Sequence, residues 1–193
     1  MSSALKVVAL VGSPTSSATS RTLLLARHLL VSLQQRVHAR VELVELAPIA
    51  RALGQSLSRG EAEPAVEQAL QTIEAAELLV VAAPVYRGSY PGLFKHLVDF
   101  IGLEALVDVP VLLAATGGSE RHALVIEHQL RPLFAFFQAQ PLGTGAFFTE
   151  RDFTEGVVTP GGAEQRFDRL VEEAVHALAA RRTAQPAAIG RAA

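Results

Sequence analysis

Residues 5–35 read LKVVALVGSPTSSATSRTLLLARHLLVSLQQ, a short apolar run joined to a leucine-rich run by a loop of small and hydroxyl residues. The first run, 5–11, is rich in valine and ends at Gly12, which is typical of a buried strand. Over 20–35 the leucines recur at helical spacing, and Ser20 can cap the start of that helix. The stretch therefore predicts a strand, a polar loop and a helix in succession.

The same alternation continues along the chain. Further strands are predicted at 40–46, 77–84, 109–118 and 141–148, and further helices at 64–76, 92–102, 121–140 and 164–182. The inner strands are apolar throughout, so both faces of the sheet must be covered. We predict an α/β fold with a parallel sheet between helices, as one domain over 1–182. Residues 47–63 are predicted to be a loop or lid, and 183–193 a disordered tail.

The amino-acid composition limits the classes of ligand and partner that the protein can bind. The chain has 193 residues, 50% of them hydrophobic, a formal net charge of −2 and no cysteine. This balance suggests neither nucleic-acid nor membrane binding, and no apolar run has the roughly 18 residues of a membrane span. Without cysteine there are no disulfides, thiolate metal ligands or thiol nucleophiles. We predict a cytoplasmic protein with no metal site.

Three strand ends carry polar loops, namely 12–22, 84–90 and 116–122. In a parallel sheet the carboxyl ends of the strands share one edge, and ligands bind near the point where strand order reverses. We therefore expect the three loops to form one site.

The first loop predicts an anion site. It runs directly into a helix, whose N-terminal amides and dipole favour negative charge. Hydroxyls of Ser13, Ser20 and Thr22 and the charge of Arg21 add to it. Neither G-x-x-x-x-G-K-[ST] nor G-x-G-x-x-G is present, so a monophosphate fits better than a triphosphate or dinucleotide. The alternative is an ordinary Ser/Thr turn with an N-cap.

The second and third loops predict a site for a flat ring. AAPVYRGSYPG, 82–92, holds both tyrosines, and Gly88 and Gly92 would let its backbone approach a planar ligand. In TGGS, 116–119, paired glycines would present backbone amides to the ring edge. The alternative is a surface turn whose tyrosines shield the core. A phosphate beside a planar heterocycle describes flavin mononucleotide (FMN).

The segments GSP…SRT, PVYRGSYPGLFKHLVDFI and LLAATGGSERHALVIEHQLRPLF resemble the flavodoxin-like NAD(P)H-dependent FMN reductases. The likeness is strongest to the branch that serves two-component alkanesulfonate and methanesulfonate monooxygenases, and it spans about residues 5–180. The resemblance implies a flavodoxin-like three-layer sandwich with strand order 2-1-3-4-5, FMN at the strand ends, and homodimers or homotetramers.

The resemblance also assigns site residues. The phosphate loop takes Ser13, Ser20, Arg21 and Thr22. The loop at the ring and ribityl chain takes Pro84, Val85, Tyr86, Arg87, Gly88 and Ser89. The loop beside the dimethylbenzene or pyrimidine side of the flavin takes Thr116, Gly117, Gly118 and Ser119. Many relatives have a basic residue directly after Gly-Ser-Pro; here it is Thr15, which shifts the phosphate contact to Arg21.

Pro132 interrupts the predicted helix at 121–140. Because proline lacks an N–H, the carbonyl of His128 loses its helical partner, and a kink or π-bulge is predicted near 128–132. The resemblance implies a π-helix here, with the residue at His128 near the flavin or at a subunit interface. The alternative is a packed interface histidine. His96 and His122 are expected on solvated faces.

The predicted activity is hydride transfer from NADH or NADPH to FMN, after which reduced flavin leaves for a partner monooxygenase. The flavin does the chemistry, so no obligatory catalytic side chain is predicted. One alternative is a quinone or azo reductase that retains its flavin. A flavodoxin-like electron carrier would be more acidic than this chain. A paralogue that has lost FMN is supported only by Thr15.

Overall fold

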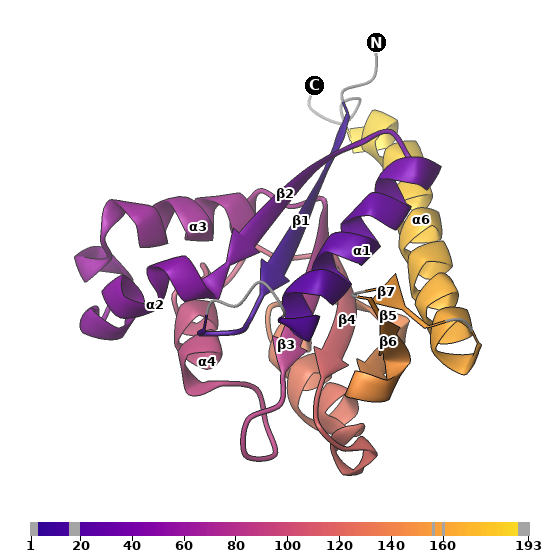
Figure 1. Ribbon diagram of the computed structural model, residues 1–193. Helices are drawn as coiled ribbons and strands as arrows, with labels where there is room; N and C mark the ends of the chain where they lie inside the picture. Colours follow the sequence, from indigo (N-terminus) through magenta and orange to yellow (C-terminus); the bar gives the residue numbers. More distant parts are fainter. Residues whose placement is uncertain (1–3, 16–19, 156, 160, 189–193) are drawn as a thin grey trace.

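Five parallel strands form one sheet in the order β2-β1-β3-β4-β5 (Figure 1). The computed structural model describes residues 4–15, 20–155, 157–159 and 161–188, with 182–188 described by their backbone alone. The strands are β1 Leu5–Val11, β2 Ala39–Glu45, β3 Leu78–Pro84, β4 Pro110–Thr116 and β5 Gln140–Phe148. This order confirms the predicted flavodoxin-like sheet.

Helices cover both faces of the sheet (Figure 1). They are α1 Arg21–Arg36, α2 Leu46–Gln55, α3 Pro64–Glu74, α4 Gly92–Asp99, α5 Arg131–Ala135 and α6 Gly162–Ala188. The buried residues of α1 and α6 share one core with one face of the sheet, and those of α2 to α5 share a second core with the other face.

The alternation of side chains explains why the central strands are apolar throughout. In β1, Val7 and Ala9 face the α1 and α6 core, whereas Val8 and Leu10 face the opposite core. All four are fully buried. Successive side chains of a strand point to opposite faces, so a strand covered on both sides has no polar positions.

The sheet brings three loops to one edge. β1 pairs with β2 on one side and with β3 on the other, and β3 pairs in turn with β4. The strand order therefore reverses at β1, and the loops after β1, β3 and β4 leave the same edge, toward the bottom of Figure 1. This is the place at which open α/β sheets bind ligands.

Residues 47–63 are not a free loop or lid, which corrects the prediction. They contain most of α2 and a 3-10 turn at Arg59–Glu61. Pro48 lies in the first turn of α2, where an N–H would have no helical partner, so it does not interrupt the helix. Only Leu46 and Leu53 of α2 are buried, and so sparse an apolar pattern did not identify a helix.

Side-chain bonds fix this segment to its neighbours. Arg59 donates through Nε and Nη2 to both carboxylate oxygens of Glu67, at 2.9 and 2.8 Å, and through Nη2 to Glu74 at 3.0 Å. The hydrogen bond with Glu67, and to a smaller extent the one with Glu74, raises the pKa of Arg59. His96 Nε2 donates to the Ser56 carbonyl at 2.8 Å, so His96 is partly buried and bonded rather than on a solvated face.

The predicted helix at 121–140 is divided. A 3-10 turn spans Glu120–His122, a π-helix spans Ile126–Leu130, and α5 follows directly. The Arg131 amide donates to the carbonyl of Ile126, and Pro132 lies in the first turn of α5. The bulge predicted from Pro132 is confirmed, but the helix is much shorter than predicted.

After β5 the chain forms two features that the sequence did not predict. A 3-10 turn spans Glu150–Asp152, and the short strands β6 Phe153–Thr154 and β7 Val157–Val158 pair antiparallel.

Helix α6 ends at Ala188, so the backbone of 183–188, predicted to lie in the tail, is helical. Residues 189–193 lie outside the described part of the chain. Among the described residues no helix is both long and apolar enough to cross a membrane.

Gly145 lets β5 approach the π-helix. A Cβ at Gly145 would lie 2.4 Å from Ile126 Cγ2, a separation that atoms do not tolerate without movement. We expect Gly145→Ala to lower the free energy of unfolding by about 1–3 kcal/mol, as overpacking in a core does. Urea unfolding monitored by circular dichroism measures this change.

Gly92→Ala is the matched control. A Cβ there would contact nothing within 4 Å, and Gly92 begins α4. We expect Gly92→Ala to leave the free energy of unfolding unchanged or to raise it by at most about 1 kcal/mol. Equal effects of the two substitutions would contradict the packing of Ile126 on β5.

Candidate functional site

The three polar loops converge on one pocket. Its volume is about 280 Å³, at the lower end of the range for small-molecule sites. It is lined by Ser13, Thr15, Ser20, Arg21, Thr22, Pro84, Val85, Tyr86, Thr116, Gly117 and Gly118. The predicted site residues outside this lining are Arg87, Gly88, Ser89 and Ser119. The described residues of this lining include no carboxylate side chain, which suits an anionic ligand.

The first loop ends in a capped helix. The Ser20 side chain accepts a hydrogen bond from the Leu23 amide at 3.4 Å, which makes Ser20 the N-cap of α1, as predicted. Ser13 is buried, and its hydroxyl donates to the Thr15 carbonyl at 3.1 Å. The first turn of α1 contains no acidic residue, so the positive end of its dipole is not neutralised from within the turn. Residues 16–19 of this loop lie outside the described residues.

Thr22 and Thr116 join α1 to the end of β4. Their hydroxyl oxygens lie 2.6 Å apart, and both residues are buried. A hydroxyl has one proton and can accept as well, so one threonine donates to the other and the second keeps its own proton. The pair can therefore donate one hydrogen bond to a ligand in the pocket, whichever threonine is the internal donor.

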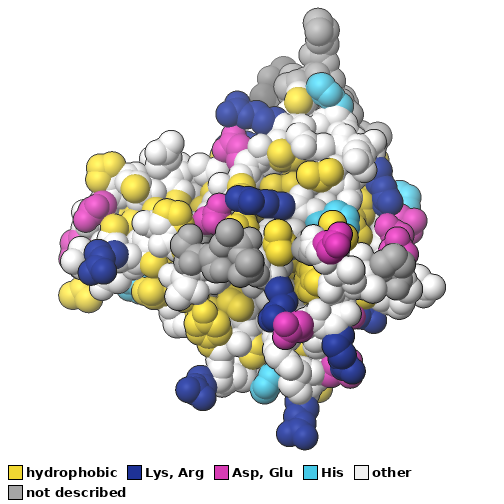
Figure 2. Space-filling view, viewed as in Figure 1, with side chains coloured by type: hydrophobic (Ala, Val, Ile, Leu, Met, Phe, Trp, Pro, Cys, Tyr) yellow, Lys and Arg dark blue, Asp and Glu magenta, His cyan; other side chains and the backbone are white. Residues whose placement is uncertain are grey.

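Arg21 has an acidic partner that the sequence analysis missed. Its Nη2 lies 2.6 Å from Glu150 Oε1, and the two side chains are 41% and 76% exposed. Glu150 follows β5, whose loop was not among the three considered. Figure 2 shows basic and acidic side chains interspersed over one face of the molecule rather than gathered by sign. The cation nearest the predicted phosphate site is thus already paired.

The second loop turns back on itself within four residues. The Tyr86 amide donates to the Ser89 carbonyl at 2.7 Å, and the Ser89 amide donates to the Tyr86 carbonyl at 3.1 Å. The two central residues, Arg87 and Gly88, have φ of 52° and 89°, the positive values of a type I′ turn. Among the described residues, nothing accepts a hydrogen bond from the amides of Arg87 and Gly88. These two amides, rather than those of Tyr86 and Ser89, are the donors available to a ligand.

The two tyrosines have different environments. Tyr86 is 43% exposed and lines the pocket. Tyr90 packs against the core, with its ring centroid 5.5 Å from that of Phe94. Tyr90 therefore anchors the base of the loop, as the core-shielding alternative expects, and Tyr86 is placed where it can cover a bound ring.

In the third loop the two glycines differ as well. The Gly117 amide donates to the Phe148 carbonyl at 3.0 Å, and a Cβ at Gly117 would lie 2.6 Å from the Phe147 ring. Gly117 is thus required by packing, and its amide is used inside the protein rather than on a ligand edge. A Cβ at Gly118 would meet nothing within 4 Å, which leaves Gly118 as the open position.

Ser119 belongs to an adjoining cavity of about 550 Å³, which also includes Gly118. Its side chain accepts from the Arg121 amide at 3.3 Å and so starts the 3-10 turn at Glu120–His122. The cavity lies between this turn and the one at Glu150–Asp152. The two cavities share Gly118, and Glu150 in the wall of this one pairs with Arg21 of the first loop.

The π-helix contacts the site through Gln129 rather than through His128. The Ser89 hydroxyl donates to Gln129 Oε1 at 3.1 Å, which connects the tyrosine loop to the bulge. His128 is exposed and does not line the pocket. The hydrogen bond from Arg131 lowers the pKa of Glu127, against the opposing effect of burial, and Arg131 also donates to the Leu142 carbonyl at 2.7 Å.

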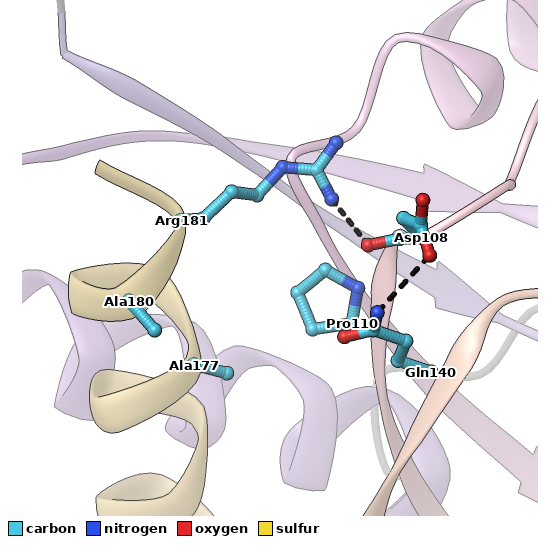
Figure 3. A pocket seen from close by; sticks show the side chains of 6 residues that line it. All are labelled: Asp108, Pro110, Gln140, Ala177, Ala180 and Arg181. Atoms are coloured by element: carbon cyan, nitrogen blue, oxygen red, sulfur yellow. Dashed lines mark hydrogen bonds between the residues drawn. The ribbon is translucent and has the colours of Figure 1, made fainter. Parts of the chain in front are cut away.

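Another cavity, of about 430 Å³, lies at the opposite end of the sheet (Figure 3). Arg181 of α6 donates to the Asp108 carbonyl at 2.7 Å, and Gln140 donates to the Asp108 carboxylate at 3.1 Å. These polar groups are bonded to one another and tie α6 to the amino ends of β4 and β5.

A family model described as NADPH-dependent FMN reductase matches residues 5–154, which include all three loops of the pocket. The chain is 55% identical over 174 residues to the NADH-dependent FMN reductase SfnF of Pseudomonas fluorescens, covering 90% of this chain and 92% of that protein. It is 54% identical over 153 residues to the FMN reductase (NADPH) of Pseudomonas aeruginosa, covering 79% and 81%. A solved oxidoreductase from Corynebacterium diphtheriae matches with a TM-score of 0.80 and 29% identity, over 92% of this chain and 98% of that one.

Arg21 is the charged side chain of the pocket, and its removal tests the phosphate assignment. We expect Arg21→Ala to weaken FMN binding by about 1–3 kcal/mol, as the loss of a charge-assisted hydrogen bond does. Riboflavin, which lacks the phosphate, should bind equally to both proteins. Quenching of flavin fluorescence measures both affinities.

Arg27→Ala is the control. Arg27 lies on the same helix, is 58% exposed and pairs with Glu45 at 3.8 Å. Its substitution should leave both affinities unchanged. Unaltered FMN affinity in Arg21→Ala would place the phosphate elsewhere.

Proposed function

This chain belongs to the NADPH-dependent FMN reductase family, and we propose that it supplies reduced FMN to a two-component, sulfonate-type monooxygenase. It is an NAD(P)H:FMN oxidoreductase, with FMN and NADH or NADPH as its substrates. The name SfnF of the P. fluorescens relative supports the sulfonate branch. We also propose a cytoplasmic location, where NADH and NADPH are available.

The donors of the pocket fit FMN. The hydroxyl of Ser20, one proton of the Thr22–Thr116 pair, and Arg21 offer hydrogen bonds and charge to a phosphate at the start of α1. Ser13 borders the same place, with its own proton donated to the Thr15 carbonyl. The amides of Arg87, Gly88 and Gly118 offer donors to the polar edge of a ring. We propose these groups, with Pro84, Val85, Tyr86, Gly117, Ser89 and Ser119 shaping the walls, as the FMN site.

The protein positions the flavin and leaves one side of it accessible. When bound, FMN supplies the hydride acceptor, and no side chain of the pocket is required as an acid or base. Tyr86 stands on an exposed turn, and the hollow continues past Gly118 into the adjoining cavity. A second nucleotide can therefore approach from this side, with its nicotinamide brought to about 3–3.5 Å from the flavin.

The direct test is turnover. We expect the purified protein to oxidise NADH or NADPH, followed at 340 nm, at a rate that depends on added FMN. Both nucleotides should be compared, because the two relatives named above differ in the one they use. Absence of FMN-dependent oxidation with both would refute the reductase activity. Protein that purifies yellow and turns over quinones with ping-pong kinetics would favour a flavin-retaining quinone or azo reductase instead.

We propose that the protein is a homo-oligomer whose subunits meet at an apolar patch between α4 and α5. Leu103 is 71% and Phe136 is 68% exposed, and both border a hollow that Ile101, Leu133 and Phe137 also line. Exposed apolar patches of this kind mark interaction surfaces. His128, exposed on the adjoining π-helix, is the further candidate for this interface.

Sedimentation velocity tests the patch. We expect Phe136→Glu to dissociate the oligomer, since it would bury a charge at the interface. Leu57→Glu, at an apolar residue that is 86% exposed elsewhere, should leave the assembly intact. A wild-type protein that sediments as a monomer at micromolar concentration would contradict the proposal.

A further inference from the structure

The ion pair between Arg21 and Glu150 occupies the group that the FMN phosphate needs. The carboxylate of Glu150 lies 2.6 Å from Arg21 Nη2. Arg21 is the one cationic side chain among the described residues that line the pocket. A phosphate entering the pocket therefore meets a guanidinium that already has an anionic partner.

The backbone that carries Glu150 is fixed. Thr149 and Asp152 form a capping box: Asp152 Oδ2 accepts from the Thr149 amide at 2.6 Å and from the Thr149 hydroxyl at 2.9 Å. Thr149 is buried, and Arg166 of α6 donates to the other oxygen of Asp152 at 3.1 Å. Glu150 thus extends from an anchored turn toward Arg21, while its own side chain stays 76% exposed and can turn away.

The pair contributes little to the fold, because ion pairs between exposed side chains add little to stability. Its effect on a ligand is larger, since a phosphate carries more charge than a carboxylate and needs the same donors. A phosphate dianion must either displace Glu150 from Arg21 or share the guanidinium with it. Either outcome weakens its binding.

We propose that Glu150 is an internal competitor that lowers the affinity of the protein for FMN by occupying Arg21, and so promotes release of the flavin. When FMN leaves, the carboxylate takes the place of the phosphate on the guanidinium. This inference rests on the proposed function, because a protein that delivers reduced FMN to a partner must release it. It concerns the phosphate end of the ligand alone.

The test compares FMN with riboflavin in Glu150→Gln. We expect this variant to bind FMN roughly three- to tenfold more tightly, a range typical of one charged contact, and to bind riboflavin as the wild type does. The gain should shrink in the Arg21→Ala background. An equal gain in that background would show simple repulsion of the phosphate and would overturn competition for Arg21.

Glu120→Gln is the matched control. Glu120 is a similarly exposed carboxylate in the wall of the adjoining cavity, but it pairs with Arg151 at 2.7 Å rather than with Arg21. Its ratio of FMN to riboflavin affinity should equal that of the wild type. An unchanged ratio in Glu150→Gln, or an equal rise in Glu120→Gln, would overturn the inference. If the wild type still oxidises NAD(P)H in an FMN-dependent manner, such results leave the reductase activity intact.

Discussion

Burial of both faces of β1, β3 and β4 is the constraint on which the structure depends. Val8 and Leu10 enter one core while Val7 and Ala9 enter the other, and β3 and β4 repeat the pattern. A one-residue slip in register would move each of these side chains to the opposite core. The register therefore holds the ends of the three strands level, and with them the loops that form the pocket.

Within the pocket, packing determines which polar groups remain for a ligand. The Gly117 amide and the amides of Tyr86 and Ser89 are bonded to carbonyls of the protein, whereas those of Arg87, Gly88 and Gly118 donate to no acceptor among the described residues. Buried polar groups are nearly always hydrogen-bonded, so the donors left over at an open edge indicate where a ligand can bind. The site is built from few groups, which suits the proposed release of the flavin.

The π-helix links this edge of the sheet to the surface of the molecule. Pro132 frees a carbonyl in the preceding turn, Gly145 allows Ile126 to pack directly on β5, and Gln129 bonds to Ser89 in the tyrosine loop. The same segment leads into α5, and the exposed Phe136 directly after that helix forms part of the proposed interface.

The sequence alone determined the features that depend on neighbouring residues: the alternation of strands and helices, the Ser20 cap and the bulge before Pro132. It also indicated that the three polar loops would lie at one edge of the sheet, because the carboxyl ends of parallel strands all lie at the same edge. Only the tertiary structure revealed α2, whose buried residues are too sparse for a clear pattern, and the separate roles of Tyr86 and Tyr90. It alone placed Glu150 on Arg21 and Phe147 against Gly117. Such contacts join residues far apart in the chain, so they depend on how the whole sheet and its helices pack and leave no periodic signal in the sequence.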